Sequence, residues 1–323
     1  MIDVYVNLRF FPDHRALPGA IARWDELGLT GVVLGDHIFP PSAYYRDPLA
    51  NRGMDQLTAL TVIATLSPRL RVGTVTSNAG FQHPLLLIRR FAELAVLYGG
   101  DRVYAGFGAG WSRREFEAIG LPMPPHAQRL NRLEESLRLA RMLFDDGYAD
   151  LDGEHVVARE LPLAPRPETS PRLLVGGGSE RLLELAGRYC DHIDLNAPSH
   201  RKSRVEPQRK LMTTVEHLGR SIESVRDAER AAGRAKGSVT TSVVITDLAF
   251  CRNSEIEAET ERICASVELP TQSLLDSPFA LLGEPRRMAE VIRARQQQLG
   301  LDWIGIPFSD VERFCADVVP LLS

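Results

Sequence analysis

The clearest indication of the fold class is the segment Arg172-Leu173-Leu174-Val175-Gly176-Gly177-Gly178-Ser179. A continuous apolar run such as Leu173 to Val175 is typical of a parallel strand that is buried on both faces. Three glycines then predict a tight turn, and Ser179 stands where a helix would begin. The segment therefore predicts a strand, a turn and the start of a helix, which is the repeating unit of an α/β protein.

The same unit recurs along the chain, for example at Val32-Val33-Leu34. Amphipathic stretches separate the apolar runs, and the alternation predicts parallel strands joined by covering helices. Eight strands are expected, at residues 3–8, 31–35, 71–77, 103–108, 172–175, 192–196, 240–246 and 303–307. They could form a closed (β/α)8 barrel or an open, doubly wound sheet.

The position of the glycines favours the closed barrel. A dinucleotide-binding open sheet carries GxGxxG after its first strand, but the first strand here runs into Arg9-Phe10-Phe11-Pro12. The run Gly106-Phe107-Gly108-Ala109-Gly110 follows the fourth strand instead. We therefore expect a single TIM-barrel domain over residues 1–323. Residues 145–171 would form an insertion. This insertion and loops including 40–51 would lie over the C-terminal mouth of the barrel or along its side.

One long helix and the insertion after it allow more detailed predictions. Residues 129–144 carry apolar residues at helical spacing, which predicts a face packed on the core. The acidic pairs Glu134-Glu135 and Asp145-Asp146 are expected to face solvent. Residues 152–155 predict a turn that enters a short strand.

Composition excludes several classes of function. Of the 323 residues, 44% are hydrophobic and 25% charged, as in an ordinary globular protein. The net charge of -4 argues against nucleic-acid binding. Neither a signal peptide nor an apolar run of membrane-spanning length is present, so we expect a cytoplasmic protein without a membrane partner. The four cysteines are widely spaced, and no metal site is expected.

In a barrel the chemistry lies at the C-terminal ends of the strands. Four ends carry informative residues: Asp36-His37, Thr76-Ser77-Asn78, Gly108-Ala109-Gly110-Trp111 and Gly176-Gly177-Gly178-Ser179. His37 could donate a hydrogen bond or a proton, because histidine titrates near neutral pH. Alternatively, it could be a structural residue held by loop carbonyls.

The glycine-rich ends each leave two interpretations open. Gly176 to Ser179 could bind a phosphate through backbone amides and a helix N-terminus, or could form only a turn with Ser179 as the N-cap. Gly106, Gly108 and Gly110 could let a flat ring approach the barrel wall, or could make room for bulky neighbours. Trp111 could wall a planar ligand or cap the core.

Motifs for hydrolysis, zinc catalysis and nucleotide phosphate binding are missing from the sequence: GxSxG, HExxH and the P-loop. Few proton-transfer groups stand at the strand ends. Such a site is typical of an enzyme whose cofactor carries the reaction.

Four ordered segments resemble the luciferase-like oxidoreductases: residues 35–41, 71–84, 105–111 with Glu115, and 174–181. The DHxFPP-like and GxGAGW segments resemble the branch that uses the deazaflavin F420. The resemblance implies a ring across the mouth beside the third and fourth strands, with its phosphate at the Gly176 turn. It also implies a homodimer and a cis peptide that does not involve proline within residues 76–78. The expected cofactor contacts are Asp36, Thr76, Ser77, Asn78, Gly108, Ala109, Gly110, Trp111, Gly176, Gly177, Gly178 and Ser179.

The resemblance assigns His37 to the hydride-transfer centre. The similar sugar-phosphate dehydrogenases carry a tryptophan where this chain has Pro41 and an acid where it has Trp111, so a sugar phosphate is not the expected substrate. We expect an F420-dependent reductase or dehydrogenase that acts on a small organic molecule. The alternatives are an FMN-dependent monooxygenase and, less favoured, a cofactor-binding barrel without catalysis.

Overall fold

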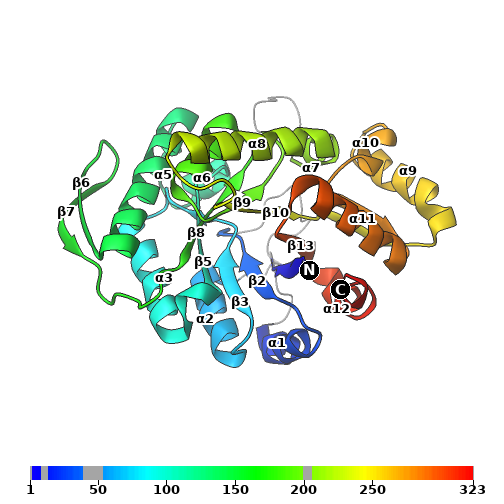
Figure 1. The fold of residues 1–323 in the computed structure, drawn as a ribbon, viewed down its shortest axis with the longest axis horizontal. Coiled ribbons are helices and arrows are strands. Elements are labelled where there is room, and N and C mark those ends of the chain that lie inside the picture. The colour runs from blue at the N-terminus through cyan, green and yellow to red at the C-terminus, as the bar shows by residue number, and fades with distance from the viewer. Residues whose placement is uncertain (1, 9–13, 39–53, 199–205, 323) are drawn as a thin grey trace.

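Eight parallel strand positions close into a barrel with helices packed around the outside (Figure 1). The computed structural model describes residues 2–8, 14–38, 54–198 and 206–322. Neighbouring strands follow the order β3-β2-β1-β13-β10-β9-β8-β5, and pairing of β3 with β5 closes the barrel. The barrel strands are β1 (Asp3–Asn7), β2 (Gly31–Leu34), β3 (Arg71–Thr74) with its continuation β4 (Ser77–Asn78), β5 (Val103–Gly108), β8 (Arg172–Gly177), β9 (His192–Leu195), β10 (Thr240–Val244) and β13 (Trp303–Pro307).

The predicted barrel and its eight strands are confirmed, with one difference. The third strand is interrupted after Thr74 and resumes at Ser77 as β4. The predicted loop at 40–51, including Pro41, lies outside the described residues, as does the segment 9–12.

The helices follow the predicted alternation and start where the sequence supplies caps. Asp55 accepts a hydrogen bond from the Thr58 amide, which opens the second helix, and Pro84 opens the third. The helices are α1 (Leu17–Glu26), α2 (Gln56–Leu66), α3 (Pro84–Tyr98), α4 (Arg113–Ala118), α5 (His126–Arg141), α6 (Glu180–Tyr189), α7 (Glu206–Leu211), α8 (Val215–Ala231), α9 (Ile256–Ser266), α10 (Gln272–Leu275), α11 (Pro285–Leu299) and α12 (Val311–Asp317).

The long helix α5 packs on the core as predicted. It ends in a π-helical turn, Met142–Asp146. The apolar stripe is buried: Leu130, Leu133, Leu137, Ala140 and Leu143.

The prediction that Glu134 and Glu135 face solvent is wrong. Glu134 pairs with Arg181, and its carboxylate lies 3.4 Å from Arg188. Glu135 accepts backbone hydrogen bonds from His155 and Val156, each of 2.7 Å. Both carboxylates therefore join α5 to other parts of the chain.

The insertion forms an antiparallel hairpin of β6 (Tyr148–Asp152) and β7 (Val157–Pro162), with the predicted turn between them. Of the two predicted positions, over the mouth or along the side of the barrel, the hairpin takes the second, because α5 has already returned the chain to the N-terminal end of the barrel. The bonds from Glu135 hold the hairpin against the outside of α5, and Figure 1 shows it at one edge of the molecule.

A second extension follows β10 and was not predicted. Strands β11 (Asp247–Phe250) and β12 (Ala280–Gly283) pair in parallel, with α9 and α10 between them. They pack around a small apolar cluster of their own, formed by Leu211, Ile263, Cys264, Leu274, Ala280 and Leu282. Their apolar runs, Leu248 to Phe250 and Ala280 to Leu282, are as long as that of β2. They were missed because the eight predicted strands already complete a barrel without them.

Aromatic rings fill the barrel interior. Tyr5, Tyr104 and Trp303 lie together with Val33 and Leu174, and the rings of Tyr5 and Trp303 are 4.5 Å apart. Across the ranges that the structure describes, the helices fall short of the length and apolar character needed to span a bilayer.

Candidate active site

The interruption of the third strand forms a bulge at the mouth of the barrel. The peptide bond between Val75 and Thr76 is cis. The sequence predicted a cis bond within residues 76–78, so its predicted place is wrong by one residue. Thr76 projects from the bulge across β5 and reaches β8, where its Cγ2 lies 3.2 Å from the point at which Gly176 would carry a Cβ.

The glycines of the fourth barrel strand make room for this bulge. A Cβ on Gly106 would lie 1.8 Å from the backbone oxygen of Thr74. A Cβ on Gly108 would lie 2.1 Å from Thr76 Oγ1. At Gly110, whose φ is +72°, a Cβ would lie 2.5 Å from the side chain of Asn78. The packing interpretation of the three glycines is therefore confirmed.

Asp36 joins the end of β2 to the bulge. Its Oδ2 accepts a hydrogen bond of 2.8 Å from the backbone amide of Asn78. Burial raises the pKa of Asp36 to about 6, against the smaller opposing effect of that bond. A carboxyl group in this state changes charge close to neutral pH.

His37 is held by a buried carboxylate rather than by loop carbonyls. Its Nδ1 lies 3.2 Å from both oxygens of Glu115, which is 2% exposed. Glu115 Oε1 also accepts a bond of 2.8 Å from the amide of Ile38. Although burial works against the charged form, the bonds from His37 and Ile38 lower the pKa of Glu115. An ionised Glu115 accepts only, so His37 carries its hydrogen on Nδ1.

The other nitrogen of His37 is turned toward the mouth. Gly35 follows Val33 on the face of β2 that points into the barrel. His37 Cδ2 and Nε2 lie 3.5 and 3.9 Å from the point where Gly35 would carry a Cβ. With Nδ1 bonded to Glu115, the Nε2 lone pair has no partner in the part of the chain that the structure describes, so it can accept a hydrogen bond from a ligand in the mouth.

Trp111 stands beside His37 and does not cap the core, because 56% of it is exposed. The two rings meet edge to face with centroids 5.7 Å apart. A large apolar ring exposed at this place can stack on a planar ligand.

The turn from Gly176 to Ser179 begins α6, a ten-residue helix. Ser179 occupies the N-cap position, but its hydroxyl makes no capping hydrogen bond. Close packing accounts for Gly178, where a Cβ would lie 2.0 Å from the backbone oxygen of Asn196. The turn therefore combines a packing glycine with a cap hydroxyl that the helix does not use.

The structure brings the predicted site residues to one end of the barrel, but the side chain of Ser77 does not face the mouth. Its side chain is fully buried in the wall and donates to Thr74 Oγ1 at 3.0 Å. The sequence alone gave Glu115 no role. Glu115 and Glu117 look alike in the short stretch Arg113–Ala118, and only the tertiary contact with His37 distinguishes them.

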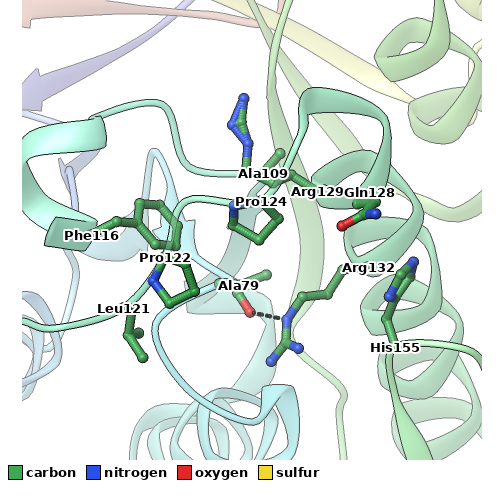
Figure 2. A pocket seen from close by; sticks show the side chains of 11 residues that line it. Ala79, Ala109, Phe116, Leu121, Pro122, Pro124, Gln128, Arg129, Arg132 and His155 are labelled. Carbon is green, nitrogen blue, oxygen red and sulfur yellow. Dashed lines mark hydrogen bonds between the residues drawn. The ribbon is translucent and has the colours of Figure 1, made fainter.

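A pocket of about 150 Å³ lies beside the mouth, behind the ends of β4 and β5 (Figure 2). Phe116, Pro122 and Pro124 form one side of it, and Arg132 and His155 the other. Arg132 donates to the backbone oxygen of Ala79 at 3.0 Å. Except for Ala109, none of the predicted site residues lines this pocket, so we place the active site at the mouth itself.

Comparisons with known proteins agree with this geometry. The profile of the luciferase-like monooxygenase family matches residues 12–303. The chain therefore belongs to the luciferase-like family, whose barrel fold it shares.

Relatives extend over nearly the whole chain. An F420-dependent glucose-6-phosphate dehydrogenase from Kribbella flavida is 24% identical over 322 residues, which cover 93% of this chain and 92% of the relative. The enzyme of the same name from Amycolatopsis mediterranei is 24% identical over 303 residues, covering 93% and 83%.

Solved structures of two reaction types share the fold. An F420-dependent secondary alcohol dehydrogenase, in complex with an F420-acetone adduct, superposes with a TM-score of 0.79 at 17% identity, covering 100% of this chain and 99% of that one. The EDTA monooxygenase of Chelativorans sp. BNC1 superposes with a TM-score of 0.77 at 18% identity, covering 99% and 93%. At these identities the likeness concerns the fold alone.

Proposed function

We propose that the protein is an F420-dependent oxidoreductase, a dehydrogenase or reductase that transfers hydride between F420 and a small organic substrate. The observation that carries the proposal is the His37–Glu115 pair at the mouth of a luciferase-like barrel, whose second ring nitrogen has no hydrogen-bond partner among the described residues. The full-length likeness to F420-dependent dehydrogenases supports the choice of cofactor.

The residues at the mouth fit such a cofactor. The unused hydroxyl of Ser179 and the N-terminus of α6 would hold a phosphate. Thr76 and the Asp36 carboxyl would border the ring, and the exposed Trp111 would cover the substrate side. When bound, F420 supplies a carbon that gives or accepts hydride.

In this proposal His37 moves the proton that accompanies hydride transfer. Because Glu115 holds the hydrogen on Nδ1, the Nε2 lone pair is free to accept the hydroxyl proton of an alcohol substrate. The buried carboxylate then stabilises the positive charge that forms on the ring, as in other histidine–carboxylate pairs. In the reductive direction the same Nε2 returns the proton to the carbonyl oxygen.

The test is a pair of variants assayed with F420. We expect His37→Ala to lower kcat by about 100-fold or more while F420 still binds, because general acid–base groups contribute about 10²–10⁴. Glu115→Gln, which keeps the shape but removes the charge, should lower kcat less and leave KM within about twofold. An unchanged kcat in His37→Ala would remove His37 from the mechanism.

The choice between cofactors is tested by titrating the protein with F420 and with FMN in competition. We expect F420 to bind at micromolar concentration or tighter, and FMN to bind weakly. Preference for FMN would favour the second candidate, a monooxygenase, which the description of the matching family as luciferase-like monooxygenases supports. If neither F420 nor FMN bound, both candidate functions would be contradicted.

We further propose that the substrate is uncharged. Trp111 presents an apolar ring where sugar-phosphate dehydrogenases carry an acid. In a substrate panel, secondary alcohols or ketones should turn over faster than glucose 6-phosphate. The reverse order would overturn this part of the proposal.

We also propose that the protein is a homodimer that acts in the cytoplasm. Helix α2 contains no charged residue, although Thr58, Thr61, Thr65 and Leu66 are exposed on it, and Leu97 of the neighbouring α3 is 66% exposed. An uncharged exposed face of this kind favours association. Sedimentation should give a dimer that Leu97→Glu dissociates. The four free cysteines support a reducing compartment.

A further inference from the structure

A chain of hydrogen-bonded polar side chains runs through the barrel interior, a region that this fold usually fills with apolar branched residues. Fully buried His192 lies at its centre, stacked on Trp303 with ring centroids 4.8 Å apart. Its Nδ1 is 2.7 Å from Thr240 Oγ1, and its Nε2 is 2.8 Å from Ser242 Oγ. Ser242 Oγ in turn lies 2.9 Å from Asp194 Oδ1. The proposed function uses none of these groups.

The chain joins the two ends of the barrel. Thr240 is the first residue of β10 and lines a polar pocket of about 250 Å³ at the N-terminal end. Trp303 also lines that pocket, and its buried Nε1 has no protein acceptor among the described residues, so the pocket can hold ordered water. At the other end, Asp194 pairs in register with Gly176, where the glycine turn of the mouth begins.

The hydroxyl of Ser242 has one hydrogen and two partners, so it permits two arrangements. If Asp194 is a carboxylate, Ser242 donates to it, and His192 must carry a hydrogen on Nε2 that donates to Ser242. If Asp194 is protonated on Oδ1, the oxygen that faces Ser242, it donates to Ser242, which donates to a bare Nε2, and His192 carries its hydrogen on Nδ1. Protonation of Asp194 at Oδ1 and the tautomer of His192 therefore change together.

Thr240 allows both arrangements. In the first, its hydroxyl donates to the bare Nδ1. In the second, it accepts from Nδ1–H and donates to the backbone oxygen of Asp191, 3.0 Å away. The Asp191 oxygen also accepts a hydrogen bond from the Thr240 amide, so it has a donor in both arrangements. The second arrangement holds one more proton than the first. When a proton enters at Thr240, each hydrogen along the chain moves across its hydrogen bond to the next group, and the second arrangement results without rotation of the imidazole ring.

The surroundings keep the ring of His192 neutral throughout. Complete burial, assisted by the positive charge of Arg172 on β8, lowers its pKa to about 3. Tyr104 on β5 contacts the ring edge to face at 5.6 Å, and Trp303 on β13 covers one side. On β8, the residue in register with Asp194 is Gly176, which has no side chain. The proton shift therefore needs no charged imidazole.

We propose that Thr240, His192, Ser242 and Asp194 form a proton-coupled switch, which sets the charge of Asp194 at the mouth from solvent at the opposite end of the barrel. An anionic ligand at the mouth disfavours a carboxylate next to it. Binding of a phosphate-bearing ligand then draws a proton onto Asp194 through the chain. The inference rests on the proposed function only for the identity of that ligand, F420.

The first experiment needs no ligand. In protein labelled with ¹⁵N-histidine, the ring resonances of His192, assigned with His192→Asn, report its tautomer over the pH range in which the protein is folded. We expect the Nε2–H form at high pH and the Nδ1–H form at low pH, with no doubly protonated ring between them. One tautomer at every pH would overturn the switch and leave a static network.

Two variants locate the coupling. Ser242→Ala removes the hydroxyl that links the two groups, so the tautomer of His192 should no longer change with pH. Thr241→Val is the matched control, because Thr241 is equally buried on the same strand and donates to Gly300 instead. It should behave like the wild type. A Ser242→Ala variant that still switched would contradict the inference.

The second experiment measures proton uptake when F420 binds, by calorimetry in two buffers of different ionisation enthalpy. We expect an uptake of up to one proton per F420 in the wild type, and clearly less in Ser242→Ala. No uptake in the wild type would overturn the link to ligand binding. If F420 did not bind at all, the proposed function would fail, whereas the tautomer measurement would still decide on the switch.

Discussion

Two buried glutamates, one at each end of the barrel, have similar burial and different partners. Glu229, at 0% exposure, accepts bonds from the amides of Gly237 and Val239 at 2.8 and 2.7 Å, and its carboxylate lies 3.0 Å from Arg226. Glu115, at 2%, is bonded to His37, whose second nitrogen faces the mouth. Although burial opposes the charge in both, the hydrogen bonds lower the pKa of each carboxyl.

The difference lies in what each carboxylate holds in place. Glu229 closes the turn between α8 and β10, and its bonds end in backbone and a structural arginine. Glu115 orients a side chain that has one ring nitrogen left for a ligand. Burial and charge alone therefore do not distinguish a structural acid from a functional one, but the partner does.

The largest effects on stability and on kcat should come from removing each of the two carboxylates in turn. Glu229→Ala leaves the amides of Gly237 and buried Val239 without their acceptor and takes the carboxylate from Arg226, which keeps only the backbone oxygen of Val239, so it should lower the free energy of unfolding by about 3–5 kcal/mol. Its kcat per folded molecule should stay unchanged. Glu115→Ala should lower kcat at least about tenfold and unfold at a urea concentration closer to that of the wild type.

Urea unfolding and active-site titration on the same preparations check this pair. If both variants lost stability equally and both kept their kcat, the proposed difference between the two ends would be wrong.

A second prediction concerns the wall behind the mouth. Gly106→Ala would place a methyl group against the backbone of Thr74, which cannot rotate away, so we expect a loss of about 1–3 kcal/mol or more. Gly19→Ala in α1 is the control, because its Cβ would meet no atom within 4 Å. It should be neutral or stabilising by up to about 1 kcal/mol. Equal destabilisation by both would contradict the packing account.

A third prediction uses the raised pKa of Asp36, about 6 in the folded protein. An unfolded aspartate titrates near 3.9, so between these values folding takes up a proton and stability falls as pH rises. Above about pH 6 the loss is complete, at about 1–3 kcal/mol. Asp36→Asn should remove this part of the pH dependence, and urea unfolding at pH 4.5 and 7.5 measures it. An identical dependence in the variant would exclude Asp36 as its source.

The smallest effect should come from an exposed ion pair at the N-terminal end. Arg71 and Asp3 lie 2.8 Å apart, with side chains 39% and 42% exposed. Asp3→Asn should change the free energy of unfolding by less than about 1 kcal/mol, and less in high salt. If Asp3→Asn lowered the free energy of unfolding as much as Glu229→Ala does, exposure would not explain the difference between an exposed and a buried carboxylate.

The sequence predicted the fold well because each barrel strand carries its own apolar run and each covering helix its own periodicity. Val103–Gly108 and Trp303–Pro307 were predicted to the residue. Prediction failed for β11 and β12, which lie outside the eight repeating units although they are as long as β2 and β9.

Only those site residues that a local sequence pattern marks were predicted. Strand ends located His37 and the glycine turn, since topology alone brings strand ends together. Glu115 and Glu135 were not recognised, because a carboxylate that accepts a bond from a distant residue has the same sequence context as one in solvent. The glycines of β5 could not be explained without Thr74, Thr76 and Asn78 opposite them.

Those opposed positions also constrain how the family can vary. Each of the three glycines 106, 108 and 110 is fitted to one residue opposite it, as Gly108 is to Thr76. A larger residue at 108 is tolerated only with a smaller one at 76, so this pair should covary among relatives. At 106 the clash is with the backbone of Thr74, and at 110 the φ of +72° disfavours a side chain, so both positions should stay glycine. The mouth of the barrel is then inherited as two fixed positions and one matched pair.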